Sequence, residues 1–424
     1  MERYVINGGR ALSGKIKIES AKNAVLPILA ASILTDEEVV IMSCPKIKDV
    51  MSMIKILNHL GVKTEFQQDN LVIDASGLNT YSVPAILTGE LRSSVFMMGS
   101  LVSRVKKAKI AYPGGCSIGL RPVDIHIKAL NELGVHVTDV FGELICTADR
   151  IRGREIYLDY PSVGATENAM LTAVFAEGKT EIHNPAKEPE IIDLMNFLNS
   201  MGARVFGAGT STIFVEGVKR LHGTCYKPMS DRIECGTYLI AAAITGGEIE
   251  LSNCNAKNIS SLIHKLCDNT CKIALKNDII HLKSGSVRKG FSIETGPYPS
   301  FPTDLQAQTM SLSTVSEGVS VITETVFETR YNHVAELMRM GASISVKGRT
   351  AIVQGVKRLH GATVTAKDLR GGAALVLAGL SAEGKTVVSQ ISHVERGYLE
   401  FDKKLRALGA DIKRKESIRP KRCK

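Results

Sequence analysis

The stretch "IIDLMNFLNSMGARVFG" (residues 191–207) decides the fold. Its apolar residues recur at i, i+3, i+4 and i+7, the pattern of an amphipathic helix. Gly202 then provides a helix C-cap, because glycine readily adopts the left-handed conformation that ends many helices. Alternating apolar and polar residues follow and predict a strand. The stretch therefore predicts a helix, a glycine turn and a strand in succession.

The same pattern occurs six times along the 424 residues. Equivalent positions are 68 to 73 residues apart, and a repeat of this kind indicates that one supersecondary unit is used again and again. Five copies carry glycine at the turn, and the fourth carries Thr270 instead. The other copies are 50–66, 123–140, 259–275, 331–346 and 398–414, and the other glycines are Gly61, Gly134, Gly341 and Gly409.

A second series of helices, rich in alanine and leucine, runs out of phase with the first. These helices are apolar nearly all round, so we expect them to be buried, whereas the first series has a polar face. Four of them are expected to end in Glu-Gly or Gly-Gly and to lead into a strand, and the other two have looser turns. The segments are 26–41, 95–111, 169–184, 239–253, 309–324 and 374–389.

Six units of this size predict an α/β protein with two domains of three units each. The boundary is expected near "YKPMSDRIECG" (226–236), between the third and fourth copies. Strands that cover buried helices are the packing that this pattern favours. A cleft between two domains is a natural place for a ligand.

Composition excludes several classes of protein. The longest apolar runs, such as 24–34, are well short of the roughly 18–20 residues that span a bilayer, and the first residues lack a signal-peptide pattern. We therefore expect a cytoplasmic protein. The sequence has neither a P-loop nor a GxGxxG motif, which disfavours nucleotide binding of those kinds. Nine cysteines, an odd number in a long chain, do not fit a secreted disulfide scaffold.

Two further features suggest ligands only weakly. Cys267 and Cys271 have the spacing of two zinc ligands, but no second ligand pair stands nearby, so no metal site is predicted. The chain has a net charge of +10, and residues 412–424 hold seven basic residues and one acidic residue. Such a tail fits either an RNA contact or, more often, a solvated terminus. The positive balance elsewhere suits an anionic small molecule.

Two polar stretches near the first-series and second-series helices are candidates for chemistry. Lys22 and Asn23 stand at the start of the first apolar helix, where free N–H groups can hold an anion, although a surface lysine and a capping asparagine would look the same. Cys116 lies among glycines in "PGGCSIGLRPVD" (113–124), five residues before Arg121. A nearby guanidinium favours the thiolate, so Cys116 is either a reactive thiol or an ordinary one.

The remaining candidates are a carboxylate and several arginines beside turns. Asp304 follows three prolines at the mouth of a buried helix, where it is expected to cap the helix and could also act as a general base. The arginines are individually unremarkable surface charges, but together they would supply bidentate donors for phosphate and carboxylate groups. They are Arg92, Arg330, Arg370 and Arg396.

At these residues the chain resembles the UDP-N-acetylglucosamine 1-carboxyvinyltransferases, which are enolpyruvyl transferases. The resemblance covers about residues 1–414 and implies an inside-out α/β barrel in two domains, 22–229 and 1–21 with 230–424, with the active site in the cleft between them. The motifs include "SAKNAVLPILAASIL" (20–34), "LRSSVFMMGSLVSR" (91–104), "PGGCSIGLRPVDIHI" (113–127), "PSVGATENAM" (161–170), "FPTDLQAQ" (301–308) and "ITETVFETRYNHVAELMRMGA" (322–342).

The resemblance also implies the reaction and the residues that carry it. The enolpyruvyl group of phosphoenolpyruvate would pass to the 3′-hydroxyl of UDP-N-acetylglucosamine with release of phosphate, as the first committed step of peptidoglycan synthesis, without metal or cofactor. Cys116 would form an adduct with phosphoenolpyruvate and donate a proton, and Asp304 would be the base. Phosphoenolpyruvate would contact Lys22, Asn23, Arg121 and Arg396, with Arg330 and Arg370 nearby. The sugar nucleotide would contact Arg92, Arg121, Pro122, Val123, Asp124, Ile125, Ser162, Val163, Gly164, Asp304 and Val326.

Two alternatives belong to other classes of function. The shikimate-pathway enolpyruvyl transferases share the repeat design, but Cys116 and its glycine-rich loop argue against that reading. A non-catalytic relative would bind a sugar nucleotide as a regulator, or RNA through the basic tail. The presence of Lys22, Cys116, Asp304 and Arg396 makes loss of catalysis an unfavoured reading, and nucleic acid is not an expected partner.

Overall fold

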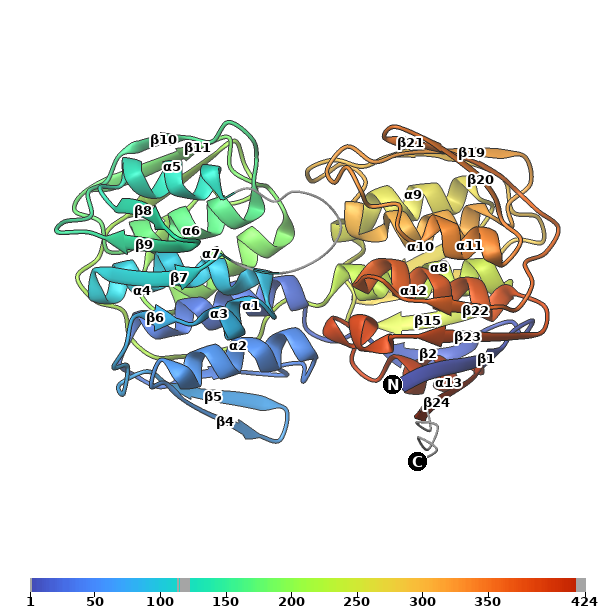
Figure 1. The fold of residues 1–424 in the computed structure, drawn as a ribbon, viewed down its shortest axis with the longest axis horizontal. Helices are drawn as coiled ribbons and strands as arrows, with labels where there is room; N and C mark the ends of the chain where they lie inside the picture. Colours follow the sequence, from blue (N-terminus) through green and yellow to red (C-terminus); the bar gives the residue numbers. More distant parts are fainter. Residues whose placement is uncertain (1, 113, 115–122, 417–424) are drawn as a thin grey trace, which may run out of the picture. The chain divides into compact units, whose positions relative to one another are not determined.

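Six mixed four-stranded sheets form the framework of the computed structural model, which describes residues 2–112, 114 and 123–416. The described chain folds as two units (Figure 1): one holds residues 2–19 and 230–416, and the other holds the described residues between 20 and 229. We call them the split unit and the inserted unit. Each sheet has one parallel and two antiparallel strand pairs, so one supersecondary design is used in all six.

The inserted unit has three of these sheets. Their strand orders are β14–β3–β5–β4 (Thr224–Tyr226, Val39–Ile41, Asn70–Asp74, Lys63–Gln67), β6–β7–β9–β8 (Ser82–Val83, Lys107–Ala111, Glu143–Thr147, His136–Val140) and β10–β11–β13–β12 (Glu155–Tyr157, Lys179–His183, Thr212–Glu216, Arg204–Phe206).

The split unit has the other three sheets, and two of them contain a strand from the start of the chain. Their orders are β22–β23–β1–β24 (Thr363–Thr365, Lys385–Ser389, Glu2–Asn7, Asp411–Glu416), β16–β17–β15–β2 (Lys272–Lys276, Ile279–Lys283, Glu248–Ser252, Ser13–Lys17) and β18–β19–β21–β20 (Ser292–Glu294, Val319–Thr323, Thr350–Gln354, Ser343–Lys347).

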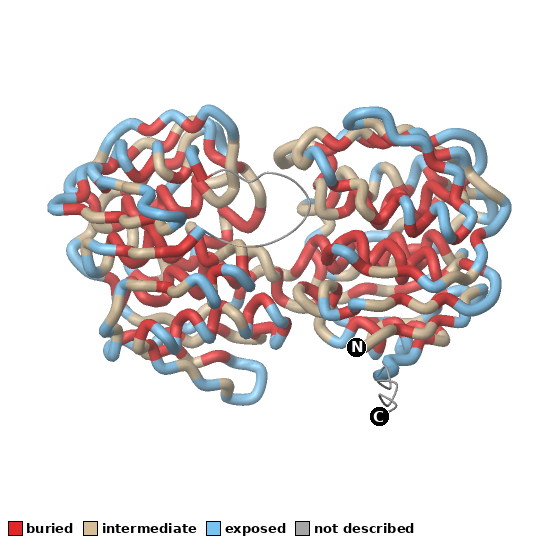
Figure 2. Tube along the Cα trace, viewed as in Figure 1, coloured by how far each residue is buried: buried red, intermediate tan, exposed pale blue. Residues whose placement is uncertain are grey.

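The apolar helices of the second series lie inside the two units. They are buried along most of their length and appear red in Figure 2, because a helix that is apolar all round has no face suited to water. In the split unit the three inner helices pack on one another. The inner helices are α1 (Lys22–Ala31), α4 (Met97–Val105), α6 (Val163–Ala173), α8 (Arg232–Thr245), α10 (Gln306–Ser313) and α12 (Leu369–Ser381).

The amphipathic helices of the first series lie outside them. In α2, for example, Met53 and Leu57 are buried while Lys55 is exposed. The outer helices are α2 (Lys48–His59), α5 (Asp124–Glu132), α7 (Pro189–Ser200), α9 (Ser260–Asp268), α11 (Val334–Arg339) and α13 (Phe401–Ala407). A short α3 (Ala85–Thr88) and five 3₁₀ turns, η1 (Ser32–Leu34), η2 (Arg92–Phe96), η3 (Ala256–Ile259), η4 (Thr303–Leu305) and η5 (Ile391–Arg396), complete the described elements.

The glycine turns behave as the sequence predicts. The glycines that follow the outer helices all have φ between 87° and 94°, including Gly61 and Gly202. Thr270 takes the same left-handed conformation with φ of 77°, which is unusual for a β-branched residue. Its hydroxyl donates to the carbonyl of Val287, a bond that holds this turn without glycine.

Three helix ends differ from expectation. The inner helices α6, α10 and α12 end at Ala173, Ser313 and Ser381, several residues before the glycines at which the sequence predicts their ends. Gly178, Gly318 and Gly384 therefore lie in the turn that enters the strand and do not cap the helix. Asp304 and Asn23 are also not caps: Asp304 lies within η4, and Asn23 is the second residue of α1, whose N-cap is Ala21.

Candidate functional site

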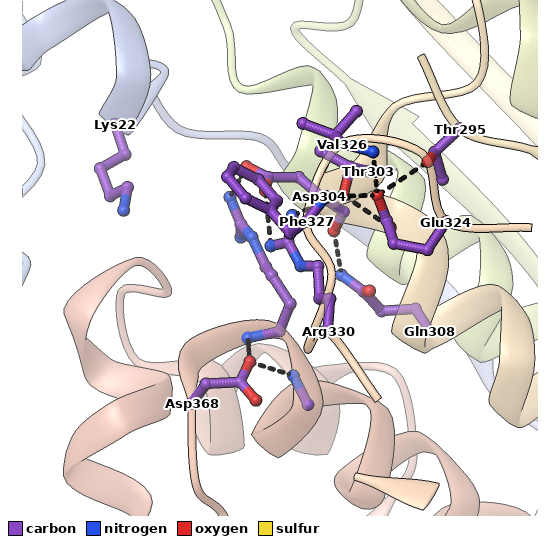
Figure 3. A network of polar contacts seen from close by, with 12 residues as sticks. Lys22, Thr295, Thr303, Asp304, Gln308, Glu324, Val326, Phe327, Arg330 and Asp368 are labelled. Carbon is purple, nitrogen blue, oxygen red and sulfur yellow. Dashed lines mark hydrogen bonds and ion pairs between the residues drawn. The ribbon is translucent and has the colours of Figure 1, made fainter. Parts of the chain in front are cut away.

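Asp304 stands between two arginines in the split unit (Figure 3). Its two carboxylate oxygens accept hydrogen bonds from Nη2 of Arg330 at 2.7 Å and from Nη2 of Arg370 at 3.1 Å. The arginine side chains are 5% and 2% exposed, whereas that of Asp304 is 26% exposed. A carboxylate flanked by two buried cations is stabilised in its charged form, and this one is partly exposed.

The three residues come from separate parts of the chain. Asp304 lies in η4 before α10, Arg330 lies in the turn before α11, and Arg370 is the second residue of α12. Asp368 caps α12, because its Oδ1 accepts from the backbone N–H groups of Arg370 and Gly371 at 3.0 and 2.8 Å. The cap fixes the start of α12 and with it the backbone of Arg370.

The ring of Tyr398 packs against the guanidinium group of Arg370. The guanidinium carbon of Arg370 lies 5.3 Å from the centre of the Tyr398 ring, within the range of a cation–π contact. The phenol oxygen is 2.8 Å from the hydroxyl of Thr237 and 3.2 Å from Nε2 of Gln308. Gln308 also donates to the backbone carbonyl of Asp304 at 2.9 Å. A buried network thus joins the three inner helices of this unit to Arg370 and Asp304.

Several guanidinium donors remain unused. Within the described residues, Nε and Nη1 of Arg370 and Nε of Arg330 are buried and make no hydrogen bond. Burying an N–H group without an acceptor costs free energy, and native proteins seldom leave such a group unsatisfied. The arrangement therefore fits a place where an anionic ligand supplies the missing acceptors.

Glu324 is the residue that sequence reasoning missed. Its carboxylate is fully buried and accepts four hydrogen bonds: from the hydroxyls of Thr295 and Thr303, both at 2.8 Å, and from the backbone N–H groups of Val326 and Phe327 at 2.9 and 3.1 Å. The Thr303 hydroxyl in turn accepts from Nη1 of Arg330 at 2.8 Å. Glu324 therefore orients the Val326 turn and, through Thr303, one of the arginines.

The inserted unit holds a second set of candidate residues at its helix starts. Lys22 is the first residue of α1, and its Nζ lies 3.0 Å from Oδ2 of Asp49 on α2. Both side chains are largely buried, so this ion pair is better shielded from solvent than a surface pair. Asn23 follows on α1 and is partly exposed.

Ser162, Val163 and Gly164 form the start of α6. The Ser162 hydroxyl accepts from the backbone N–H of Ala165 at 3.3 Å and so caps the helix. A Cβ atom at Gly164 would lie 2.9 Å from Cε1 of His126, so any larger residue would push the ring away. Arg92 opens η2, while Asp124 and Ile125 open α5 after Val123, its N-cap residue.

His126 is buried between these elements and is neutral. Burial, and then the charge of Arg92, lower its pKa to about 3. Nδ2 of Asn168 lies 2.8 Å from its Nδ1, and Asn168 also donates to the carbonyl of Val95 at 3.0 Å. Because the amide nitrogen is the donor, Nδ1 is the acceptor and the proton resides on Nε2.

The low pKa of His126 makes a prediction about stability. A histidine whose folded pKa is depressed stabilises the fold above pH 6.5, and that contribution is lost as the pH falls towards 3. We expect the free energy of unfolding of the original chain to fall by about 2 to 3 kcal/mol more between pH 6.5 and 4.5 than that of His126→Asn. Urea unfolding across this range measures it. The exposed His136→Asn is the matched control, and equal slopes for all three chains would contradict a buried neutral His126.

Other residues predicted from the sequence fall into three groups. Arg396 is the last residue of η5, and Val326 forms part of the turn held by Glu324. Asp304, Arg330 and Arg370 are brought together, as described above. Cys116, Arg121 and Pro122 lie outside the described residues, as does most of the basic tail. Sequence reasoning treated Arg330 and Arg370 as separate charges, and gave no sign that they share one carboxylate.

Neither a metal-binding cluster nor a membrane-spanning helix occurs in the part of the chain that the structure describes. No three histidine, cysteine, aspartate or glutamate side chains in 2–112, 114 and 123–416 are grouped so that they could hold a metal ion. Over the same residues, every helix is too short or too polar to span a bilayer.

Known proteins share this fold. The family model for EPSP synthase (3-phosphoshikimate 1-carboxyvinyltransferase) matches residues 6–405. The chain therefore belongs to the EPSP synthase family of carboxyvinyltransferases. Among solved structures, the enolpyruvyl transferase NikO from Streptomyces tendae superposes with a TM-score of 0.87 at 24% identity, covering 97% of this chain and 98% of that one. EPSP synthase from Acinetobacter baumannii gives a TM-score of 0.76 at 19% identity, covering 98% of this chain and 100% of that one.

The relatives identified by sequence carry the name of one particular carboxyvinyltransferase. UDP-N-acetylglucosamine 1-carboxyvinyltransferase 2 of Caldanaerobacter subterraneus subsp. tengcongensis is 51% identical over 98% of this chain and 100% of its own length. UDP-N-acetylglucosamine 1-carboxyvinyltransferase 2 of Clostridium tetani is 47% identical over 98% of this chain and 100% of its own length. The fold and the family expected from the sequence are confirmed, although the sheets of each unit are separate and do not close into a barrel in the described residues.

Proposed function

We propose that this chain transfers the enolpyruvyl group of phosphoenolpyruvate to the 3′-hydroxyl of UDP-N-acetylglucosamine and releases phosphate. This is the first committed step of peptidoglycan synthesis. Relatives of matching length that carry the name of this transferase support the substrates. The observation that carries the chemistry is Asp304, a partly exposed carboxylate between two buried arginines with unused donors. A cytoplasmic location is part of the proposal, since both substrates are cytoplasmic metabolites.

Asp304 is assigned the role of general base. The sugar hydroxyl must lose a proton as its oxygen attacks C2 of phosphoenolpyruvate, and a partly exposed carboxylate can accept that proton. The same carboxylate can later remove a proton from C3 while phosphate leaves. Arg330 and Arg370 hold the carboxylate through two hydrogen bonds, so the acceptor atoms are positioned before the substrate arrives.

Cationic side chains are assigned to phosphoenolpyruvate. Lys22, Asn23, Arg121 and Arg396 are proposed to contact its phosphate and carboxylate, with Arg330 and Arg370 nearby. Lys22 lies at the start of α1, where backbone N–H groups and the helix dipole also favour an anion. Positively charged donors fixed in place stabilise the negative charge that moves onto the leaving phosphate.

Cys116 is assigned the proton that must reach C3. Protonation of C3 makes C2 electrophilic, and a thiol near neutral pKa can deliver that proton. The thiol can also add to C2, which accounts for a covalent adduct of Cys116 with phosphoenolpyruvate. The sugar nucleotide is assigned to Arg92, residues 121–125, Ser162 to Gly164, Asp304 and Val326.

Phosphate release tests the proposal. The purified chain is mixed with phosphoenolpyruvate and either UDP-N-acetylglucosamine or shikimate 3-phosphate, and inorganic phosphate is followed with time. We expect release with the sugar nucleotide, and only background release with shikimate 3-phosphate or with either substrate alone. If phosphate were released from phosphoenolpyruvate with shikimate 3-phosphate and not with UDP-N-acetylglucosamine, the chain would instead be assigned the shikimate-pathway reaction. No release with either acceptor, from a chain that gives a cooperative unfolding transition, would overturn the proposed function.

A further inference from the structure

Two cysteines of the split unit touch through their sulfur atoms. Cys235 lies in the first turn of α8, and Cys254 follows β15 after Asn253. The Sγ atoms are 3.4 Å apart, and the two residues are 2% and 4% exposed. A disulfide bond is about 2.05 Å long, so the sulfurs would have to approach by roughly 1.3 Å to form one.

The backbone holds both cysteines firmly on either side of this contact. The N–H of Cys235 donates to the carbonyl of Asp231 at 3.0 Å, and the N–H of Cys254 donates to the carbonyl of Asp278 at 2.8 Å. The side chain of Asn253 donates to the carbonyl of Ile18 at 2.7 Å. The helix and the strand that carry the pair are joined through Gly246 and Gly247 and pack on each other. The first turn of α8 and the segment after β15 thus place the two thiols against each other.

We propose that Cys235 and Cys254 form a reversible oxidation site, which a hydroperoxide closes to an internal disulfide and a dithiol reopens. The proposal makes no use of the transfer reaction, so it stands or fails independently of the proposed function. Contact between two buried thiols also occurs as simple packing, and the test below separates the two cases.

The chemistry balances with hydrogen peroxide as the oxidant. One thiolate attacks a peroxide oxygen, the O–O bond breaks, and the sulfur becomes a sulfenic acid as water is released. The second thiol then attacks that sulfur, the S–OH bond breaks, and a second water leaves with the proton of the thiol. Two thiols are oxidised by two electrons in total, and one peroxide is reduced to two waters.

The environment of the pair makes the first step slow compared with an exposed thiol. A hydrogen bond with Cys254, followed by burial, raises the pKa of Cys235 well above its ordinary value. Little thiolate is therefore present at neutral pH, and peroxide must enter through local opening. Cys225 is exposed and should react sooner, so it reports that the oxidant is active. Once a sulfenic acid forms at the pair, the neighbouring sulfur is already in contact with it.

Peptide mapping gives a direct readout. Trypsin cleaves after Arg232 and Lys257, so both cysteines fall in one peptide, 233–257, which contains no other cysteine. The full chain is treated with hydrogen peroxide, free thiols are blocked with iodoacetamide, and the digest is analysed without reduction. We expect the oxidised peptide 233–257 to carry neither of its two alkyl groups and to contain an internal disulfide. Dithiothreitol before alkylation should restore the doubly alkylated form.

Matched variants decide the interpretation. In Cys254→Ser, Cys235 has no partner, so its peptide should remain singly alkylated or carry an oxygen adduct, without a disulfide. The proposal is overturned if peptide 233–257 stays doubly alkylated when Cys225, in peptide 221–232, has been oxidised. It is equally overturned if the oxidised peptide carries sulfinic acid and no disulfide. Reaction of Cys267 and Cys271 appears in a separate peptide, 266–272, and cannot be mistaken for it.

Discussion

Replacing Asp304 by asparagine is expected to lower kcat for phosphate release by about 100- to 10,000-fold. Asparagine has nearly the same shape, and its amide oxygen can still accept from Arg330, but it cannot take a proton from the sugar hydroxyl. The two buried arginines also lose the charge that they share. Steady-state phosphate release with phosphoenolpyruvate and UDP-N-acetylglucosamine measures the change.

Controls separate loss of the base from loss of the fold. Asp278 lies in the same unit and is exposed, so Asp278→Asn should leave kcat within about twofold, as for most surface changes. The Asp304→Asn chain should still unfold cooperatively and should still be stabilised against heat by UDP-N-acetylglucosamine. If Asp304→Asn kept more than half of the original kcat, Asp304 would not be the base.

Glu324→Gln is the second change with a large expected effect. Glutamine retains one accepting oxygen, but its amide nitrogen is a donor and would face either the Thr303 hydroxyl or the two backbone N–H groups. One side of this buried network would then lack an acceptor. Hydrogen bonds to charged groups contribute about 1.5 to 3 kcal/mol each, so we expect the free energy of unfolding to fall by about 2 kcal/mol. We also expect kcat/KM for the sugar nucleotide to fall roughly 10- to 100-fold, because the Val326 turn and Arg330 lose their orientation.

A nearby glutamate provides the matched control. Glu328 follows the same turn, but its side chain is 53% exposed and pairs with exposed Arg349. Glu328→Gln should therefore change stability by less than about 0.5 kcal/mol and leave kcat/KM nearly unchanged. Urea unfolding and phosphate-release kinetics test both variants together. Loss of stability in Glu324→Gln with an unchanged kcat/KM would assign Glu324 to the fold alone.

Most of the fold could be predicted from the repeats in the sequence. A helix that is apolar all round can only be inside, and the buried α6 and α12 follow directly from that rule. The glycine after five of the six outer helices likewise predicts a left-handed turn, because few other residues adopt that conformation without strain. The wrong predictions were local. The ends of α6, α10 and α12 and the capping role of Asp304 depend on a few residues that periodicity does not resolve.

The candidate site was only partly predictable. The motif resemblance named Asp304, Arg330 and Arg370. However, Arg330 lies 26 positions and Arg370 lies 66 positions after Asp304, and no local sequence pattern predicts a contact over such separations. Glu324 was missed for a related reason. It stands one residue after the strand β19 and has the ordinary appearance of a polar residue leaving a sheet. The four groups that donate hydrogen bonds to its carboxylate come together only in the folded chain.

The position of β1 has a consequence for how the chain is made. This strand pairs on one side with β23 and on the other with β24, which begin at Lys385 and Asp411. At ribosomal rates of about 5 to 20 residues per second, β1 waits roughly 20 to 80 seconds for its neighbours. The inserted unit, whose last strand ends at Tyr226, can complete its sheets while synthesis continues. A nascent chain therefore carries a finished globule behind an unpaired strand with two open edges, and it is this strand that a chaperone would need to shield until translation ends.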